Sequence, residues 1–179
     1  TVQRPKFLVV DPVMVSTSGC ALMQPDALAI MKERLLPMAD LVTPNLPEAW
    51  TLAGSDTSVD DAAQAILGLG VKALLIKGGH AEGKIKTDYL YIYKGGSISR
   101  VEFSAETVDT ENTHGTGCTL SAAIAAYHAR GCGMEEAVRQ AKAYLTKALV
   151  AGAGVKAWHG HGPVNHLSDP CKMIVKDEA

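Results

Sequence analysis

The sequence predicts an α/β fold with a mostly parallel β-sheet, and two observations lead to this prediction. Short, continuously apolar segments alternate in the first half of the chain with segments whose apolar residues recur at helical spacing. Two alternating segments and two long helical segments follow in the second half. Continuously apolar strands are typical of parallel sheets covered by helices on both faces. Because there is no internal repeat, linker or low-complexity tract, we expect residues 1–179 to form a single domain.

The first two strands and the first two helices follow from apolar runs and their spacing. Residues 6–11, KFLVVD, form a continuous run typical of a short buried strand. A helix is predicted over residues 25–39, because apolar residues recur there at helical spacing and Pro25 suits a first helical turn. Residues 40–43 are predicted as a second strand, and residues 47–54 as a short helix that ends at a glycine.

A capping pattern marks the next helix. Ser58 and Asp61 are spaced as in a capping box, in which each side chain accepts a hydrogen bond from the other residue's backbone N–H. This pattern predicts a helix over residues 59–70. The apolar run that follows predicts a third buried strand over residues 71–79.

The second half of the chain adds a hairpin and two helices. Residues 87–94 and 97–103 alternate in polarity, and the two glycines between them predict a tight antiparallel turn. Residues 116–130 are rich in alanine and are predicted as a helix that other elements can approach closely. Residues 134–152 carry a helical apolar stripe. Residues 158–167 contain three histidines and no periodic pattern, and we expect an irregular polar loop.

Composition excludes several classes of partner. Hydrophobic residues make up 47% of the chain and the formal net charge is −2, which is ordinary for a globular protein and unsuited to nucleic acid or anionic membranes. The longest apolar run is far shorter than the ~20 residues of a membrane helix, and the first residues lack the layout of a signal peptide. We therefore expect a cytoplasmic protein with reduced thiols at its four separated cysteines, Cys20, Cys118, Cys132 and Cys171.

The segment 112–120, NTHGTGCTL, joins a loop to the start of a predicted helix. It is not a Walker A loop, which requires G-x-x-x-x-G-K-[ST], and Leu120 stands where a dinucleotide loop needs a small residue. Gly115 and Gly117 nevertheless allow backbone N–H groups to face an anion, and the helix N-terminus adds positive charge. The segment is consistent with a phosphate site, or alternatively with a plain loop-to-helix turn.

Cys118 follows these glycines directly. In the first turn of a helix the local field favours the thiolate, so Cys118 is a candidate base or nucleophile beside a bound phosphate. The alternative is a small buried apolar residue, which is how most free cysteines behave. Thr113 and Thr116 add hydroxyl donors around the same loop.

Four further candidates lie where predicted strands end. Asn45 and Glu48, at a helix entrance, carry oxygen ligands suited to Mg²⁺, although an ordinary helix cap would place the same residue types there. Asp11 and Lys77 each end a buried strand, as site residues or as solvated charges. The carboxyl ends of parallel strands share one edge, where ligands gather. A carboxylate, a pair of side chains suited to binding Mg²⁺, a lysine and a loop suited to binding an anion would lie at one edge. This combination favours phosphoryl transfer from a nucleotide.

Five segments together resemble a known family: 10-VDPVM-14, 43-TPNLPEA-49, 76-IKGGH-80, 112-NTHGTGCTLSAAIAA-126 and 160-GHGPVNH-166. Over nearly the whole chain, from about residue 6 to about residue 167, the sequence is similar to the hydroxymethylpyrimidine/phosphomethylpyrimidine kinases of thiamine biosynthesis, which are members of the ribokinase-like superfamily. The resemblance implies a ribokinase-like fold. It also implies ATP- and Mg²⁺-dependent phosphorylation of 4-amino-5-hydroxymethyl-2-methylpyrimidine and then of its monophosphate.

The resemblance assigns roles to the glycine loop. It implies that Gly115, Thr116 and Gly117 form an anion hole for the phosphate in transfer, with Thr113 beside the nucleotide. Cys118 stands where most ribokinase-like enzymes have a catalytic aspartate, and would also contact the substrate.

The strand ends receive roles in the same way. The resemblance implies that Asn45 and Glu48 organise Mg²⁺ and that Asp11 lies near the metal and the phosphates. Lys77 would contact the nucleotide phosphates, and Val13 would line the pyrimidine pocket.

The sequence departs from the family pattern at two places. Cys20 stands where the family usually has an acidic residue, and the family's N-terminal glycine-rich substrate segment has no counterpart here. We therefore expect a chain truncated at its N-terminus, which carries the ATP-binding and catalytic portion. A pyridoxal kinase and a non-catalytic nucleotide-binding fragment are the alternative functions, and a homodimer is an assembly that the sequence leaves open.

Overall fold

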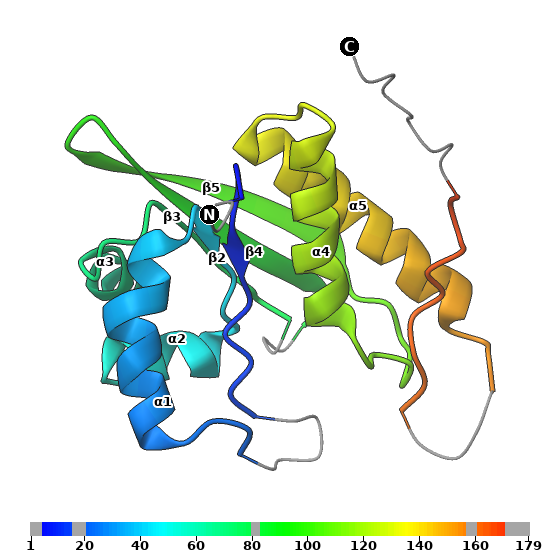
Figure 1. Cartoon of the computed structure of the whole chain (residues 1–179). Helices are drawn as coiled ribbons and strands as arrows, with labels where there is room; N and C mark the ends of the chain where they lie inside the picture. Colours follow the sequence, from blue (N-terminus) through cyan, green and yellow to red (C-terminus); the bar gives the residue numbers. More distant parts are fainter. Residues whose placement is uncertain (1–4, 16–20, 80–82, 157–160, 171–179) are drawn as a thin grey trace.

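The protein is a mixed β-sheet with helices on both faces (Figure 1). This computed structural model describes residues 5–15, 21–79, 83–156 and 161–170. The strands, in spatial order, are β1 (Val9–Val10), β2 (Leu41–Val42), β3 (Ala73–Ile76), β4 (Ile85–Lys94) and β5 (Ser97–Glu106). The helices are α1 (Pro25–Ile30), α2 (Leu46–Ala53), α3 (Val59–Leu67), α4 (Thr116–Ala129) and α5 (Met134–Gly152).

The strands divide into a parallel part and an antiparallel hairpin. β1 pairs with β2 and β2 with β3 in parallel, whereas β4 pairs antiparallel with both β3 and β5. The predicted α/β class with a hairpin is therefore confirmed. The hairpin is longer than predicted, because pairing continues outward to Ile85 opposite Glu106.

Two hydrophobic cores lie on opposite faces of the sheet. Alternate residues of β3 point to different cores: Leu74 and Ile76 pack with the α1–α3 side, and Ala73 and Leu75 with α4 and α5. All four residues are at most 2% exposed. A fully buried large aliphatic side chain stabilises a fold by about 1.5–3 kcal/mol, so β3, which is covered on both faces, is the centre of the structure.

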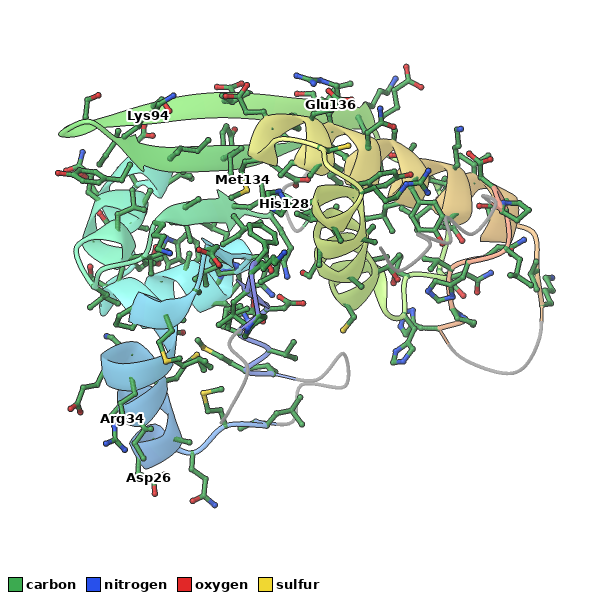
Figure 2. The ribbon with its side chains drawn as sticks, turned by 45° about the horizontal axis from the view of Figure 1, so that its top comes forward. Asp26, Arg34, Lys94, His128, Met134 and Glu136 are labelled. Atoms are coloured by element: carbon green, nitrogen blue, oxygen red, sulfur yellow. The ribbon has the colours of Figure 1, made fainter. Side chains whose placement is uncertain are left out.

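The predicted helix 25–39 is divided into three pieces. α1 continues into a π-helical turn, Met31–Leu35, and a 3₁₀ turn, Leu36–Met38. Pro37 lies in the last turn, and because proline has no N–H, the regular α-helical hydrogen bonds cannot continue through it. Asp26 and Arg34 project outward from this segment (Figure 2).

The hairpin is fastened to α3 by a polar cluster. The hydroxyl group of Tyr91 donates a hydrogen bond of 2.6 Å to Asp60 at the start of α3, and Arg100 pairs with the same carboxylate at 3.0 Å. Burial and the bond to Asp60 raise the pKa of Tyr91 above its ordinary value. The tyrosine side of the hairpin thus packs against α3.

No helix in the described part of the chain is long and apolar enough to cross a membrane.

Candidate active site

The ends of β1 and β3 bring a carboxylate and an ammonium group together. Asp11 directly follows β1 and Lys77 directly follows β3. Lys77 Nζ lies 2.6 Å from Asp11 Oδ1, and each side chain is only 13% exposed. The backbone N–H of Lys77 donates to the carbonyl oxygen of Pro44 at 2.8 Å, which holds this lysine beside the end of β2. The predicted meeting of these strand ends at one edge of the sheet is confirmed.

The first turn of α4 lies against this ion pair. Gly115 precedes α4 with a φ of +81°, in the left-handed region that glycine adopts without strain. A Cβ atom placed on Gly117 would lie 3.1 Å from Lys77 Nζ and 3.5 Å from Asp11 Oδ2. The N–H groups of a first helical turn have no partner within the helix and carry partial positive charge. The glycine loop, Lys77 and Asp11 are therefore parts of one site.

Two buried hydroxyl groups hold α4 on the sheet at this point. Thr43 follows β2 and is fully buried, and its Oγ1 lies 2.8 Å from Oγ of Ser121, in the second turn of α4. Ser121 also donates to the carbonyl oxygen of Gly117 at 3.1 Å, and Thr43 lies 3.3 Å from Asp11 Oδ1. The pair thus links the carboxylate, the end of β2 and the glycine loop.

One oxygen of Asp11 is buried without a partner. Oδ2 has no hydrogen-bond partner among the described residues, whereas Oδ1 accepts from Lys77. A buried carboxylate oxygen without a partner is costly unless a ligand or cation engages it. Mg²⁺ uses one or two carboxylates together with waters and substrate phosphates, so the donor set around Asp11 fits this ion.

Asn45 and Glu48 form a capping box at the start of α2. Asn45 Oδ1 accepts from the N–H of Glu48 and Glu48 Oε2 accepts from the N–H of Asn45, both at 2.8 Å. This is the helix-cap arrangement that the sequence left open, and it engages the single side-chain oxygen of Asn45 and one of the two carboxylate oxygens of Glu48. The backbones of Asn45 and Lys77 form an isolated parallel β-bridge, so the cap lies beside the ion pair. Among the described residues, no group of three or more His, Cys, Asp or Glu side chains is arranged to hold a metal ion.

Cys118 is exposed, in the third position of α4. The alternative of a buried apolar cysteine is therefore wrong. Cys118 lines a cavity of about 550 Å³, whose walls include Ala122 and Ala126 of α4, Tyr144 of α5 and Pro170. Cys118 thus lines this cavity and directly follows Gly117 of the glycine loop.

The remaining predicted residues surround the same edge. Thr113 and Val13 are exposed, and Val13 donates its N–H to the carbonyl oxygen of Asp11 at 2.9 Å. Thr116 begins α4 and donates its N–H to Thr113. Cys20 lies outside the described residues.

The segment that leads into the glycine loop is tied to the tail of the chain. The buried Asn112 donates to the carbonyl oxygens of Gly152 and Val155 and accepts from the N–H of Gly162. His166 contacts Thr119 of α4 at 3.0 Å. Residues 161–167, the described part of the segment 158–167, are irregular as predicted, and they secure the loop before α4.

Several residues at this edge were not among the candidates that we predicted from the sequence. Thr43 and Ser121 are common polar residues inside motif segments. Asp88 and Lys142 form a buried ion pair of 2.7 Å between β4 and α5. The signal for Asp88 was available, because a single carboxylate stands in the run 88-DYLYIY-93, which is otherwise aromatic and aliphatic.

Comparison with known proteins identifies the family. A family model described as phosphomethylpyrimidine kinase matches residues 1–165. The chain belongs to the phosphomethylpyrimidine kinase family. A hydroxymethylpyrimidine/phosphomethylpyrimidine kinase of Rhizobium meliloti is 48% identical to it over 167 residues, which cover 90% of this chain and 61% of the relative.

Solved structures agree with this membership of the phosphomethylpyrimidine kinase family. The pyridoxal kinase from Staphylococcus aureus in complex with AMP-PCP matches with a TM-score of 0.77 and 36% identity, over 90% of this chain and 58% of that chain. The phosphomethylpyrimidine kinase from Clostridium difficile matches with a TM-score of 0.64 and 39% identity, over 81% and 58% of the two chains. The fold is ribokinase-like, as predicted. The chain spans about three fifths of the length of these relatives.

Proposed function

We propose that the protein carrying this chain transfers the γ-phosphate of ATP to the hydroxymethyl group of 4-amino-5-hydroxymethyl-2-methylpyrimidine, and then a second phosphate to the monophosphate. The observation that supports this most is the junction of Lys77, Asp11 and Gly117 at one sheet edge. An ammonium group and the N–H groups of a helix N-terminus around one point favour a phosphate in transfer. Membership of the phosphomethylpyrimidine kinase family supports the pyrimidine substrate.

Each candidate site residue has a part in the proposed mechanism. The N–H groups of Gly115, Thr116 and Gly117 donate to the oxygens of the phosphate in transfer. The sulfur of Cys118, whose side chain is exposed, accepts the hydroxyl proton as the hydroxymethyl oxygen attacks phosphorus and the bond to ADP breaks. Lys77 donates to the nucleotide phosphates as a point charge.

The other residues act on the cation and on the substrates. Asp11 would hold Mg²⁺ directly through Oδ2, and Asn45 and Glu48 would hold its waters from the start of α2. Bound Mg²⁺ supplies positive charge that offsets the charge of the phosphates. Thr113 lies beside the nucleotide and Val13 beside the pyrimidine ring.

Substrate turnover tests this proposal. The natural protein that carries this sequence is incubated with ATP, Mg²⁺ and either the hydroxymethylpyrimidine or pyridoxal, and ADP release and phosphorylated product are measured. A higher kcat/KM for the pyrimidine is expected. The similarity to the Staphylococcus aureus pyridoxal kinase makes pyridoxal phosphorylation the second candidate, and a preference for pyridoxal would establish it. ATP binding without either product would indicate a non-catalytic nucleotide-binding protein.

We further propose a cytoplasmic location, small-molecule substrates with no nucleic-acid or membrane partner, and residues 1–179 as one structural unit. Cys118 and Cys132 are free thiols, which suits a reducing compartment. A homodimer is the working hypothesis for the assembly. Light scattering coupled to gel filtration measures the mass of the natural protein, and a monomer mass would refute the homodimer.

A further inference from the structure

A buried carboxylate of β4, on the sheet face that α4 and α5 cover, is hydrogen-bonded to the chain at the active-site edge. Asp88 lies in β4 on the face that also carries Leu90, toward α4 and α5. Its two oxygens have different partners: Oδ2 lies 2.7 Å from Lys142 Nζ, and Oδ1 accepts the N–H of Gly78 at 2.9 Å. The side chains of Asp88 and Lys142 are 8% and 12% exposed.

Gly78 is the residue directly after Lys77, and its backbone is confined. A Cβ atom on Gly78 would lie 1.8 Å from the carbonyl oxygen of Thr87, so the chain passes β4 at a distance that only glycine permits. The N–H of Lys77 is bound to Pro44 on one side and the N–H of Gly78 to Asp88 on the other. Two successive N–H groups thus fix the direction in which the Lys77 side chain leaves β3.

Stability alone does not explain this ion pair. Taking two charges out of water is expensive, and apolar residues of similar volume are often equally stable in such positions. A buried charge pair sets geometry when its hydrogen bonds are directional, and a carboxylate that accepts a backbone N–H makes a strong, directional bond. Here the ammonium group of Lys142 holds one oxygen, so that the other is aimed at Gly78.

We propose that Asp88 and Lys142 are positioning residues for nucleotide binding: through the N–H of Gly78 they hold the exit of β3 so that Lys77 faces Asp11 and the glycine loop. Neither side chain contacts the reacting groups in this assignment. The kinetic part rests on the proposed kinase function, whereas the link from Asp88 to Gly78 is independent of it.

Two double variants separate the charge pair from the acceptor. Asp88→Asn with Lys142→Met removes both charges but keeps an amide oxygen that accepts the N–H of Gly78. Asp88→Leu with Lys142→Met removes the charges and the acceptor together. Tyr91→Phe is the control for lost stability, because it removes a hydrogen bond from the same strand on the opposite face.

The measurements are the KM values for ATP and for the pyrimidine, and hydrogen exchange at the Gly78 amide. With Asp88→Leu/Lys142→Met we expect the KM for ATP to rise at least about tenfold while the KM for the pyrimidine stays within about threefold. The Gly78 amide should exchange at least about tenfold faster relative to the amides of β3. With Asp88→Asn/Lys142→Met both quantities should stay within about threefold of the parent. Tyr91→Phe should leave both KM values unchanged.

Each outcome has one meaning. Equal KM values for ATP in the Leu and Asn double variants would overturn the positioning role, as would unchanged exchange at Gly78. If the Leu double variant does not fold, Asp88→Ala/Lys142→Met replaces it, since a water can fill the space without fixing Gly78, and the same rise in the KM for ATP is expected. A parent protein without phosphotransfer would refute the proposed function, and Gly78 exchange alone would then decide the structural link.

Discussion

Replacing Thr43 by valine removes one hydroxyl group from the buried pair with Ser121 and keeps the shape of the side chain. The change deletes the 2.8 Å hydrogen bond to Ser121 and the longer contacts to Val10 O at 3.5 Å and Asp11 Oδ1 at 3.3 Å. Ser121 retains the carbonyl oxygen of Gly117 as an acceptor. The lesion is therefore one short buried hydrogen bond plus weak contacts.

The expected cost follows from these contacts. A buried hydrogen bond contributes about 1 kcal/mol, and a buried partner left unsatisfied costs about 1–3 kcal/mol. Because Ser121 keeps an acceptor, we expect Thr43→Val to lower the free energy of unfolding by about 1.5–2.5 kcal/mol. For a chain of this size that corresponds to a fall in Tm of about 3–10 °C.

A double-mutant cycle with Ser121→Ala tests the assignment. Both single variants remove the same hydrogen bond, so the double variant should lose about 1 kcal/mol less than the sum of the two. Urea unfolding followed by circular dichroism measures each free energy, with the slope against urea checked for constancy. Thr43→Ser, which keeps the hydroxyl group, should retain the coupling. Strict additivity of Thr43→Val and Ser121→Ala would refute the reasoning.

Three further predictions concern Cys118, the segment that follows β3, and the hairpin. Cys118→Ala should lower kcat by about 10²–10⁴-fold with little change in ATP affinity, measured by steady-state kinetics and calorimetry; a near-normal kcat would remove Cys118 from the role of base. Gly78→Ala should destabilise the fold severely, because the new Cβ would meet the Thr87 carbonyl oxygen at 1.8 Å, whereas Gly79→Ala, with nothing within 4 Å, should be tolerated; equal unfolding free energies would contradict this. The pKa of Tyr91 is raised in the folded state, so the protonated hydroxyl group stabilises the fold below about pH 10. Above that value the tyrosine of the unfolded chain loses its proton first, and this stabilisation falls as the pH rises. The stability difference between the parent and Tyr91→Phe should therefore shrink above about pH 10 in urea titrations, and a constant difference would argue against the bond.

Local patterns in the sequence account for most of the elements. Apolar runs predicted β1, β2 and β3, because a strand that is buried on both faces appears in the sequence as a continuous run of apolar residues. The ends of these strands were harder to predict: residues 71–79 yield a strand of only Ala73–Ile76, and Lys77 forms an isolated bridge to Asn45. The break in the helix after α1 depends on Pro37, which was visible in the sequence but was included in the predicted helix.

The candidate site was predictable to the extent that it follows from sheet topology. Asp11, Lys77 and the glycine loop meet because strand ends share an edge. The supporting pairs were not predictable, since Thr43 and Ser121 are 78 residues apart and Asp88 and Lys142 are 54 apart. Their contacts depend on strand order and on the rotation of α4 and α5, which no local pattern specifies.

The long sequence separation within the site has a consequence for how the molecule folds. Asp11 and Lys77 are 66 residues apart, and Thr43 and Ser121 are 78 apart, so no contiguous segment contains the site. Closing such long loops costs conformational entropy that is recovered only when the sheet and α4 come together. The site is thus absent from partly folded states, and a ligand that binds at this edge stabilises the native state relative to all of them.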